Sequence, residues 1–230
     1  MAIEPIATAL VQTKERIACA ARACGRRPEE VKLVAVSKQQ PVQAVRLAYQ
    51  AGQRDFGESY VQELASKADS CKDLIDLSWH LVGRLQRNKA QSAVRYAKVV
   101  HSVDSARLAK ELGRRAASAD HGLSVLVQIN LGAEPQKGGC APGELEAVLQ
   151  AVESESALKL AGLMTVPPQT PDPSGARPYF DALVKLRDQH GGQTRLPELS
   201  MGMSFDLEQA VAAGATLVRV GSAIFGERGD

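Results

Sequence analysis

The feature that most constrains the fold is a regular alternation of short apolar runs with amphipathic segments along the chain. About eight runs are rich in β-branched residues and short enough to be buried strands. They lie at 33–36, 55–57, 77–82, 99–103, 124–129, 158–166, 198–203 and 217–220. Apolar residues at helical spacing fill the segments between them, for example 41–53, 105–119, 143–154, 177–190 and 207–213. Strand followed by helix, repeated in this way, predicts parallel pairing with right-handed crossovers.

This pattern leaves two α/β architectures open, a doubly wound sheet and a closed barrel. Only the barrel normally uses some eight units in one domain, so we expect a single (β/α)8 barrel of the TIM type. No linker or break in composition divides the chain, and the predicted domain therefore covers residues 1–230. Apolar positions at helical spacing that stop at Gly25 and Pro28 predict an extra N-terminal helix within residues 1–25, packed on the barrel.

Composition argues against several classes of function. The 28 basic and 26 acidic side chains give a net charge of only +2, without the basic footprint of a nucleic-acid binder. The first residues lack a secretory signal, and no run approaches the length of a membrane-spanning helix. The four cysteines are scattered, with no C-x-x-C pair and no histidine at zinc spacing, which is typical of free thiols. We expect a cytoplasmic protein that binds neither nucleic acid nor a membrane nor a metal ion.

Lys38 directly follows the first predicted strand and Ser37, at the mouth of the expected barrel. A lysine there is partly desolvated, and desolvation favours the neutral amine, which is the form that attacks an aldehyde to give a Schiff base. The alternative is an ordinary strand-end lysine that reaches into solvent. Position alone does not decide between these two interpretations.

Two segments that contain glycine and serine lie at the carboxyl ends of the last two predicted strands, 200–204 at the end of the seventh and 221–222 directly after the eighth. In (β/α)8 barrels the loops after strands seven and eight are the usual phosphate site, because free backbone N–H groups there face an anion. Each segment by itself is also compatible with an ordinary turn, but the two together favour phosphate. The candidate cofactor-binding residues in them are Ser200, Gly202, Met203, Ser204, Gly221 and Ser222.

Further polar side chains are expected near the mouth. Arg219 points to the same side of its strand as the second of these segments, where it would meet the ring of an aromatic cofactor. The alternative for Arg219 is a pair with a carboxylate in the barrel. His80 is interpreted as a satisfied core histidine rather than a catalytic base. The basic run of Arg84, Arg87 and Lys89 is interpreted as a solvated face rather than a binding patch.

Several short motifs occur in order between residues 31 and 228. They are Ala-Val-Ser-Lys at 35–38, Phe-Gly-Glu-Ser-Tyr-Val-Gln-Glu at 56–63, Trp-His-Leu-Val-Gly-Arg-Leu-Gln-Arg-Asn-Lys at 79–89, Gly-Leu-Met-Thr at 162–165, Ser-Met-Gly-Met-Ser-Phe-Asp at 200–206 and Val-Arg-Val-Gly-Ser-Ala-Ile-Phe-Gly at 218–226. With these motifs the sequence resembles the pyridoxal phosphate homeostasis proteins, the YggS/PROSC family.

The resemblance implies the fold of the alanine racemase N-terminal domain and a bound pyridoxal 5′-phosphate. It implies an aldimine of this cofactor on Lys38, phosphate contacts from 200–204 and 221–222, and Arg219 facing the pyridine nitrogen. It also implies a role in vitamin B6 homeostasis without established catalysis. We therefore expect a monomeric carrier, not an enzyme, whose partners are pyridoxal phosphate and the apo-enzymes that receive it. A racemase-like amino-acid enzyme is the alternative, and a protein that works chiefly through a partner surface is the third hypothesis.

The racemase alternative requires a base on each face of the cofactor. In the racemases that this barrel resembles, the second base is a tyrosine from a C-terminal domain. That domain is expected to be absent here, since the sequence stops at Asp230, soon after the eighth unit. Tyr60, near a predicted strand end, is the one candidate substitute. We therefore expect no turnover of alanine.

Two positions depart from the family pattern. Ser59 stands where the family usually has Asn, and Leu81 where Phe is common. The change at Leu81 is one of packing. Ser59 is shorter than Asn and offers no amide, so any cofactor contact made by that amide is lost or passes through water.

Overall fold

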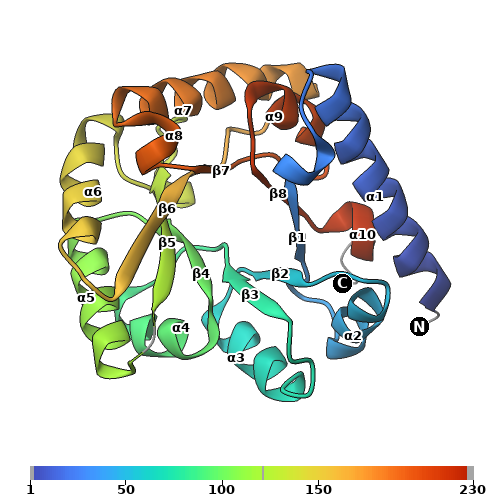
Figure 1. Ribbon diagram of the computed structural model, residues 1–230, viewed down its shortest axis with the longest axis horizontal. Helices are drawn as coiled ribbons and strands as arrows, with labels where there is room; N and C mark the ends of the chain where they lie inside the picture. Colours follow the sequence, from blue (N-terminus) through green and yellow to red (C-terminus); the bar gives the residue numbers. More distant parts are fainter. Residues whose placement is uncertain (1–2, 121, 227–230) are drawn as a thin grey trace.

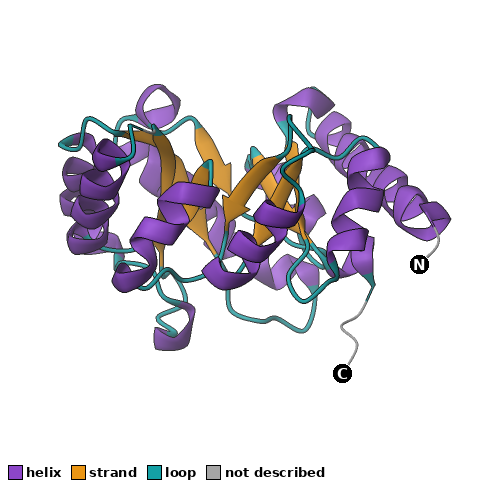
Figure 2. Cartoon of the chain, turned by 90° about the horizontal axis from the view of Figure 1, so that it is seen from below, coloured by secondary structure: helices purple, strands orange, loops and turns teal. Residues whose placement is uncertain are grey.

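The computed structural model describes residues 3–120 and 122–226 and forms the expected closed barrel (Figure 1). Eight parallel strands pair in chain order, and β8 pairs with β1 to close the sheet. Figure 2 shows the strands in the middle of the molecule with the helices around them. The strands are β1 (Lys32–Val36), β2 (Asp55–Glu58), β3 (Ser78–Leu81), β4 (Val99–Val103), β5 (Leu123–Ile129), β6 (Leu158–Thr165), β7 (Glu198–Ser200) and β8 (Leu217–Val220).

Helices cover the outside of the barrel, and at least one connects each strand to the next. They are α1 (Ile3–Ala23), α2 (Val42–Gln50), α3 (Val61–Ser70), α4 (Ala90–Tyr96), α5 (Ala106–Ser118), α6 (Leu145–Glu153), α7 (Arg177–Gln189), α8 (Gly192–Arg195), α9 (Leu207–Ala213) and α10 (Ser222–Phe225). The first helix, α1, precedes the repeat and contacts α2, α9 and α10. In the part of the chain that the structure describes, no helix has the length and hydropathy needed to cross a membrane.

Both faces of the sheet are buried, which explains why the strand sequences are almost continuously apolar. Inside the barrel, Val34, Leu126, Met164 and Leu217 form a small apolar cluster. Strand residues of the opposite face, such as the fully buried Phe56, pack against the helices in a larger cluster. Since side chains alternate along a strand, neighbouring residues of one strand point to different layers.

Among the strands, β7 differs most from the sequence prediction. The pattern predicts a strand over 198–203, but β7 ends at Ser200. Gly202 has a φ of +90°, in the left-handed region, and a Cβ on it would lie 2.4 Å from the Cβ of Ala210. The chain therefore leaves the sheet early, and residues 201–206 form a loop instead of the end of a strand.

The four cysteines are free thiols, as expected from their spacing. Cys19 and Cys24 are exposed, whereas Cys71 and Cys140 are buried. Burial raises the pKa of the Cys140 thiol to about 12, so this group stays protonated and unreactive at neutral pH. Within residues 3–120 and 122–226, no cluster of His, Cys, Asp and Glu side chains has the arrangement of a metal site.

Candidate functional site

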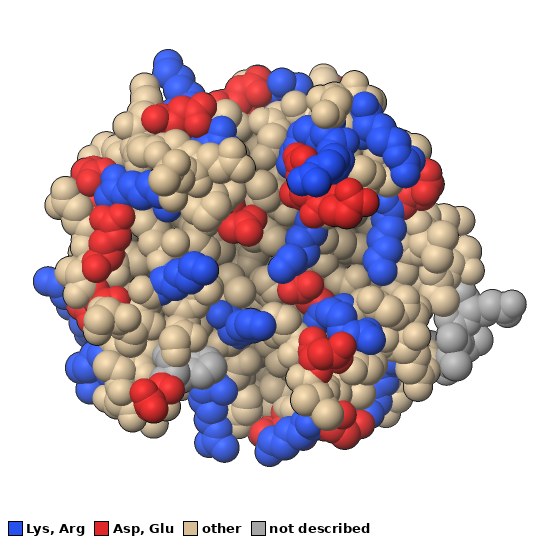
Figure 3. All heavy atoms as spheres, viewed as in Figure 1, with Lys and Arg blue, Asp and Glu red and all other residues tan. Residues whose placement is uncertain are grey.

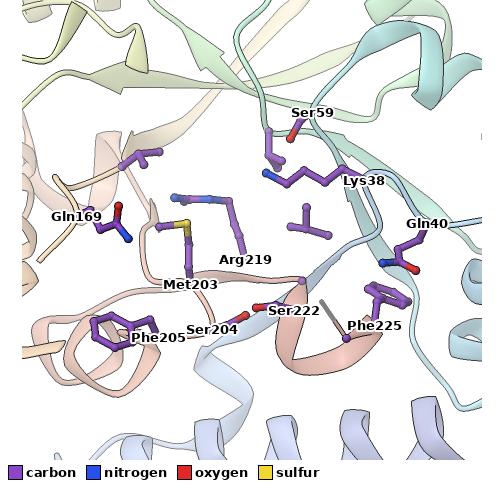
Figure 4. Close-up of a pocket in the computed structure, with 15 residues that line it drawn as sticks. Lys38, Gln40, Ser59, Gln169, Met203, Ser204, Phe205, Arg219, Ser222 and Phe225 are labelled. Carbon is purple, nitrogen blue, oxygen red and sulfur yellow. The ribbon is translucent and has the colours of Figure 1, made fainter. Parts of the chain in front are cut away.

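A cavity of about 740 Å³ opens at the carboxyl ends of the strands. This end of a (β/α)8 barrel is where active and binding sites are built. Of the eight site residues predicted from the sequence, six lie in the cavity wall, and Ser200 and Gly202 do not. The lining residues are Val36, Lys38, Gln40, Ser59, Val82, Val166, Gln169, Met203, Ser204, Phe205, Arg219, Gly221, Ser222, Phe225 and Gly226 (Figure 4).

Lys38 lies just after the end of β1 and is partly buried. Figure 4 shows its side chain extending across the cavity, with the amine toward Ser59 and the guanidinium of Arg219. The structure therefore places Lys38 in the cavity wall and not in open solvent. A partly desolvated amine at this position can react with an aldehyde that enters the cavity.

The hydroxyls of Ser204 and Ser222 lie close together on the side of the cavity opposite the lysine (Figure 4). The Ser204 hydroxyl accepts a hydrogen bond from the backbone N–H of Ala223 at 3.3 Å. Arg16 of α1 donates to the backbone carbonyl of Ser204 at 3.1 Å and also pairs with Glu208. These contacts hold the loop after β7 against the segment after β8, so that both hydroxyls can face one anion.

The other predicted residues of these two segments shape the wall. Gly221 approaches β1 so closely that a Cβ would lie 3.0 Å from a backbone carbonyl oxygen of that strand. The carbonyl of Gly202 accepts a hydrogen bond from the backbone N–H of Arg219 at 2.9 Å. Met203 lines the cavity and donates its N–H to the carboxylate of Asp206 at 2.6 Å. Gly202 therefore does not line the cavity itself but supports the wall through its backbone hydrogen bond to Arg219.

Arg219 is 5% exposed and lies at the floor of the cavity. Its Nη1 donates to the hydroxyl of Ser200 at 2.6 Å, and its Nη2 donates to the carbonyl of Thr165 at 2.9 Å. Burial lowers the pKa of Arg219 to about 10, with partial compensation from the charge of Asp206, so the side chain is still a cation at neutral pH. Its hydrogen bonds go to a hydroxyl and a carbonyl. Among the described residues, Arg219 therefore does not form the alternative that the sequence left open, an ion pair with a barrel carboxylate.

Ser200 is the first member of a hydrogen-bonded chain that leads away from Arg219. The Ser200 hydroxyl lies 2.8 Å from Nδ1 of His101, and Nε2 of His101 lies 2.9 Å from Nδ1 of His80. Nε2 of His80 lies 3.0 Å from the carboxylate of Asp55. An ionised carboxylate only accepts, so with both histidines neutral each group donates to the next, from Arg219 to Asp55. The chain connects β8, β7, β4, β3 and β2 across the barrel interior.

The charges along this chain follow from burial. His101 is fully buried, and this burial, with a further contribution from the charge of Arg219, lowers its pKa well below the usual 6.5. For Asp55, burial alone would raise the pKa, but the hydrogen bond from His80 and nearby lysines lower it. Both ring nitrogens of His80 are hydrogen-bonded inside the barrel, which confirms the interpretation of this residue as a satisfied core histidine.

The two departures from the family pattern lie in different places. Ser59 is part of the cavity wall, and its hydroxyl faces Lys38 in Figure 4. Leu81 is fully buried in the helix-facing core, in agreement with a change of packing. Four further lining side chains were not named as candidates from the sequence. Gln40 and Gln169 lie outside the quoted motifs, whereas Phe205 and Phe225 lie within two of them. Their positions after the ends of strands are the signal that identifies them.

The basic run after β3 lies beside the cavity. Arg84, Arg87 and Lys89 line a neighbouring groove of about 700 Å³ together with Asp104. Arg84 and Arg87 are exposed, as predicted for a solvated face. On the face that Figure 3 shows, Lys and Arg side chains are interspersed with Asp and Glu. That face therefore carries no extended surface of one sign.

The lowered pKa of His101 predicts that the protein loses stability in mild acid. Below pH ~6.5 the unfolded chain protonates this histidine while the folded protein does not, so folding stability must fall as the pH falls. As the pH falls, the unfolding free energy of the wild type should decrease more steeply than that of His101→Gln. The two slopes should differ by about 1.4 kcal/mol per pH unit. Urea unfolding between pH 7.5 and ~5 measures both slopes. Equal slopes would contradict the prediction.

Comparison with known proteins identifies the family. The profile of the family described as "Alanine racemase, N-terminal domain" matches residues 10–229. A protein of Aquifex aeolicus named "Pyridoxal phosphate homeostasis protein" is 41% identical over 221 residues, which cover 95% of this chain and 96% of that protein. A protein of the same name from Escherichia coli K12 is also 41% identical, over 97% of each chain.

Solved structures give the same result. PipY of Synechococcus elongatus PCC7942, solved with PLP bound, matches with a TM-score of 0.84 and 39% sequence identity. The match covers 96% of this chain and 100% of the PipY chain. An alanine racemase of Clostridium difficile 630 has a TM-score of 0.71 at 15% identity, so that it shares the fold alone, and this chain covers 57% of its length. The chain therefore belongs to the family of the pyridoxal phosphate homeostasis proteins, built on the alanine racemase N-terminal domain.

Proposed function

We propose that this protein binds pyridoxal 5′-phosphate in the cavity at the barrel mouth, holds it as an aldimine on Lys38, and stores and delivers it to other proteins. The observation that carries the proposal is that an amine, two serine hydroxyls and a buried guanidinium converge on one cavity. Family membership supports the same assignment, because relatives at 41% identity are named for pyridoxal phosphate homeostasis.

The lining groups fit each part of this cofactor. A volume of about 740 Å³ lies within the usual range for small-molecule sites. The amine of Lys38 would take the aldehyde, and the hydroxyls of Ser204 and Ser222 with the Gly221 backbone would hold the phosphate. Arg219, between these two ends in Figure 4, would donate to the pyridine nitrogen. The cofactor supplies a reactive carbonyl, and the chain supplies position and hydrogen bonds.

Storage and delivery without turnover are favoured by two features. Arg219 stays protonated at neutral pH, so a ring nitrogen next to it is held as an acceptor and is a poor electron sink for carbanion chemistry. Among the described residues no tyrosine lines the cavity. Tyr60, the candidate for a second base, is exposed and lines the neighbouring groove instead. The racemase alternative is supported by the shared fold only.

The proposal includes a monomeric protein in the cytoplasm whose receiving partners are apo-enzymes that use the cofactor. Four free thiols, two of them exposed, suit a reducing compartment. The cavity opens to the surface through loops, so that an acceptor protein can approach the bound aldehyde.

Lys38 is expected to carry the covalent bond. Borohydride reduction of the protein loaded with pyridoxal phosphate, followed by peptide mapping, should give the pyridoxyl mass on the peptide that contains Lys38. The variant Lys38→Ala serves as the control and should take up no label in that peptide. A label found only on another lysine, such as Lys89 or Lys137, would refute the assignment.

The phosphate is expected to supply much of the affinity. Pyridoxal lacks this group and would lose several charge-assisted hydrogen bonds, each worth about 1.5–3 kcal/mol. Its dissociation constant should therefore be larger by orders of magnitude than that of pyridoxal phosphate. Isothermal titration of both aldehydes measures the two dissociation constants. In Ser204→Ala the difference between these constants should be smaller than in the wild type. Equal constants in the wild type would rule out a phosphate site here.

Alanine is not expected to be racemised at the rate of an enzyme. The loaded protein is incubated with L-alanine in heavy water, and optical rotation and α-deuterium incorporation are followed together. Because a base is present on one face only, we expect slow exchange without multiple turnovers. Turnover near the enzyme median of about 10 per second would overturn the carrier assignment in favour of the racemase.

A further inference from the structure

Behind Lys38, on the outer face of the barrel, lies an ionic cluster of the buried Glu58 and Lys67 and the partly exposed Glu63. Glu58 is the last residue of β2, and the other two lie one turn apart on α3. Lys67 Nζ contacts the carboxylates of Glu58 and Glu63, each at 2.8 Å. Lys67 and Glu58 side chains are 7% and 0% exposed. The cofactor contacts proposed above use none of these side chains.

The cluster holds the main chain on both sides of Lys38. The third contact of Lys67 is to the backbone carbonyl of Ser37 at 2.6 Å, so all three of its N–H groups are used. On the other side, the backbone N–H of Gln39 donates to the carboxylate of Glu63 at 2.6 Å. Ser37, directly before Lys38, is therefore bound to Lys67 of α3, and Gln39, directly after it, is bound to Glu63 of the same helix.

These contacts act on a tight turn. The N–H of Gln40 donates to the carbonyl of Ser37 at 3.0 Å, which makes Lys38 the second residue of a four-residue turn and Gln39 the third. Gln39 has a φ of +60°, a left-handed conformation that favours glycine. A glutamine stays in this conformation only where its surroundings hold it. The hydrogen bond from its N–H to Glu63 holds Gln39 in this conformation. The conformation of the turn determines the direction in which the Lys38 side chain points.

We propose that Glu63 and Lys67 are positioning residues that fix the turn 37–40 and so aim the Lys38 amine into the cofactor cavity. This role rests on the function proposed above. It assigns to the Phe-Gly-Glu-Ser-Tyr-Val-Gln-Glu motif, whose last residue is Glu63, a task beyond packing. The motif joins the end of β2 to α3 and passes behind the lysine.

Packing alone does not account for the cluster. Two carboxylates share one ammonium, and Oε2 of Glu58 is buried without a hydrogen-bond partner in the described part of the chain. Burial raises the pKa of Glu58, against the opposing hydrogen bonds of Lys67 and Ser37. An apolar pair would join α3 to β2 without this desolvation cost. What the ionic cluster adds is a donor for the Ser37 carbonyl and an acceptor for the Gln39 N–H.

The test separates bonding to the lysine from binding of the rest of the cofactor. Pyridoxine 5′-phosphate has the same ring and phosphate but an alcohol in place of the aldehyde, so it forms no Schiff base. In Glu63→Ala we expect the dissociation constant of pyridoxal 5′-phosphate to rise about tenfold, the effect of losing one hydrogen bond. The constant for pyridoxine 5′-phosphate should stay within about twofold.

Conservative variants show which property of Glu63 matters. Glu63→Gln keeps a carbonyl oxygen for the Gln39 N–H and should restore the affinity for pyridoxal phosphate to within about twofold of the wild type. Glu63→Asp keeps the charge but withdraws the oxygen by about 1.5 Å, one bond length, and should share the loss. Asp69→Ala removes an exposed acid from the same helix and should change neither constant.

The outcomes are distinct. A loss confined to the aldehyde, with rescue by Glu63→Gln, supports the positioning role. An equal loss for both ligands, or no loss in either Glu63→Ala or Glu63→Asp, overturns it. Thermal unfolding of the cofactor-free variants shows whether Glu63→Ala has a folding defect. If it has one, the affinities of Glu63→Asp for the two ligands decide between the outcomes. If the wild type binds both ligands equally tightly and takes up no borohydride label, the proposed function itself fails, independently of the variants.

Discussion

The structure depends most on the burial of one cation, the guanidinium of Arg219, inside a closed barrel. A buried charge without partners is strongly unfavourable, so its N–H groups need acceptors at fixed positions. Ser200 and Thr165 supply these acceptors from β7 and β6, at 2.6 and 2.9 Å. The Ser200 hydroxyl must in turn donate, and it does so to His101 in a chain that ends at Asp55. One polar side chain at the mouth therefore constrains residues on most of the barrel strands.

The same chain determines which chemistry the mouth can perform. With both histidines neutral, every hydrogen bond in the chain points from Arg219 toward Asp55, so none of its members donates back to Arg219. Burial keeps His101 neutral at pH 7, and Arg219 keeps its proton. A pyridine nitrogen placed against Arg219 meets a hydrogen-bond donor with a high pKa and remains unprotonated. Arg219 would thus hold such a ring through a hydrogen bond to its nitrogen, in line with the proposed binding of the cofactor.

Local sequence patterns are sufficient for the architecture and for six residues of the cavity wall, because buried parallel strands and the residues that follow them are local features. The places of Lys38 and Arg219 at the barrel mouth could be predicted from strand ends and alternation, but their roles could not. The length of β7 was not, since its end depends on the close approach of Gly202 to Ala210, a contact with a helix later in the chain. The partner of His101 was also unpredictable, because Ser200 lies 99 residues away and only closure of the barrel brings the two together.

Alternation along β1 explains why the site extends beyond the cavity. Ser37 faces outward, where its hydroxyl donates to Glu58, while the next residue, Lys38, faces the cavity. A one-residue step therefore connects the mouth to the layer between the barrel and α3. The spacing of Glu63 and Lys67 identifies an ion pair on a helix face but carries no information about the backbone that they bind. The contacts of α3 and the Arg219 network lie on opposite faces of the same sheet. In a protein proposed to release its ligand, a change in the contacts of α3 can therefore move Lys38 without disturbing the Arg219 network.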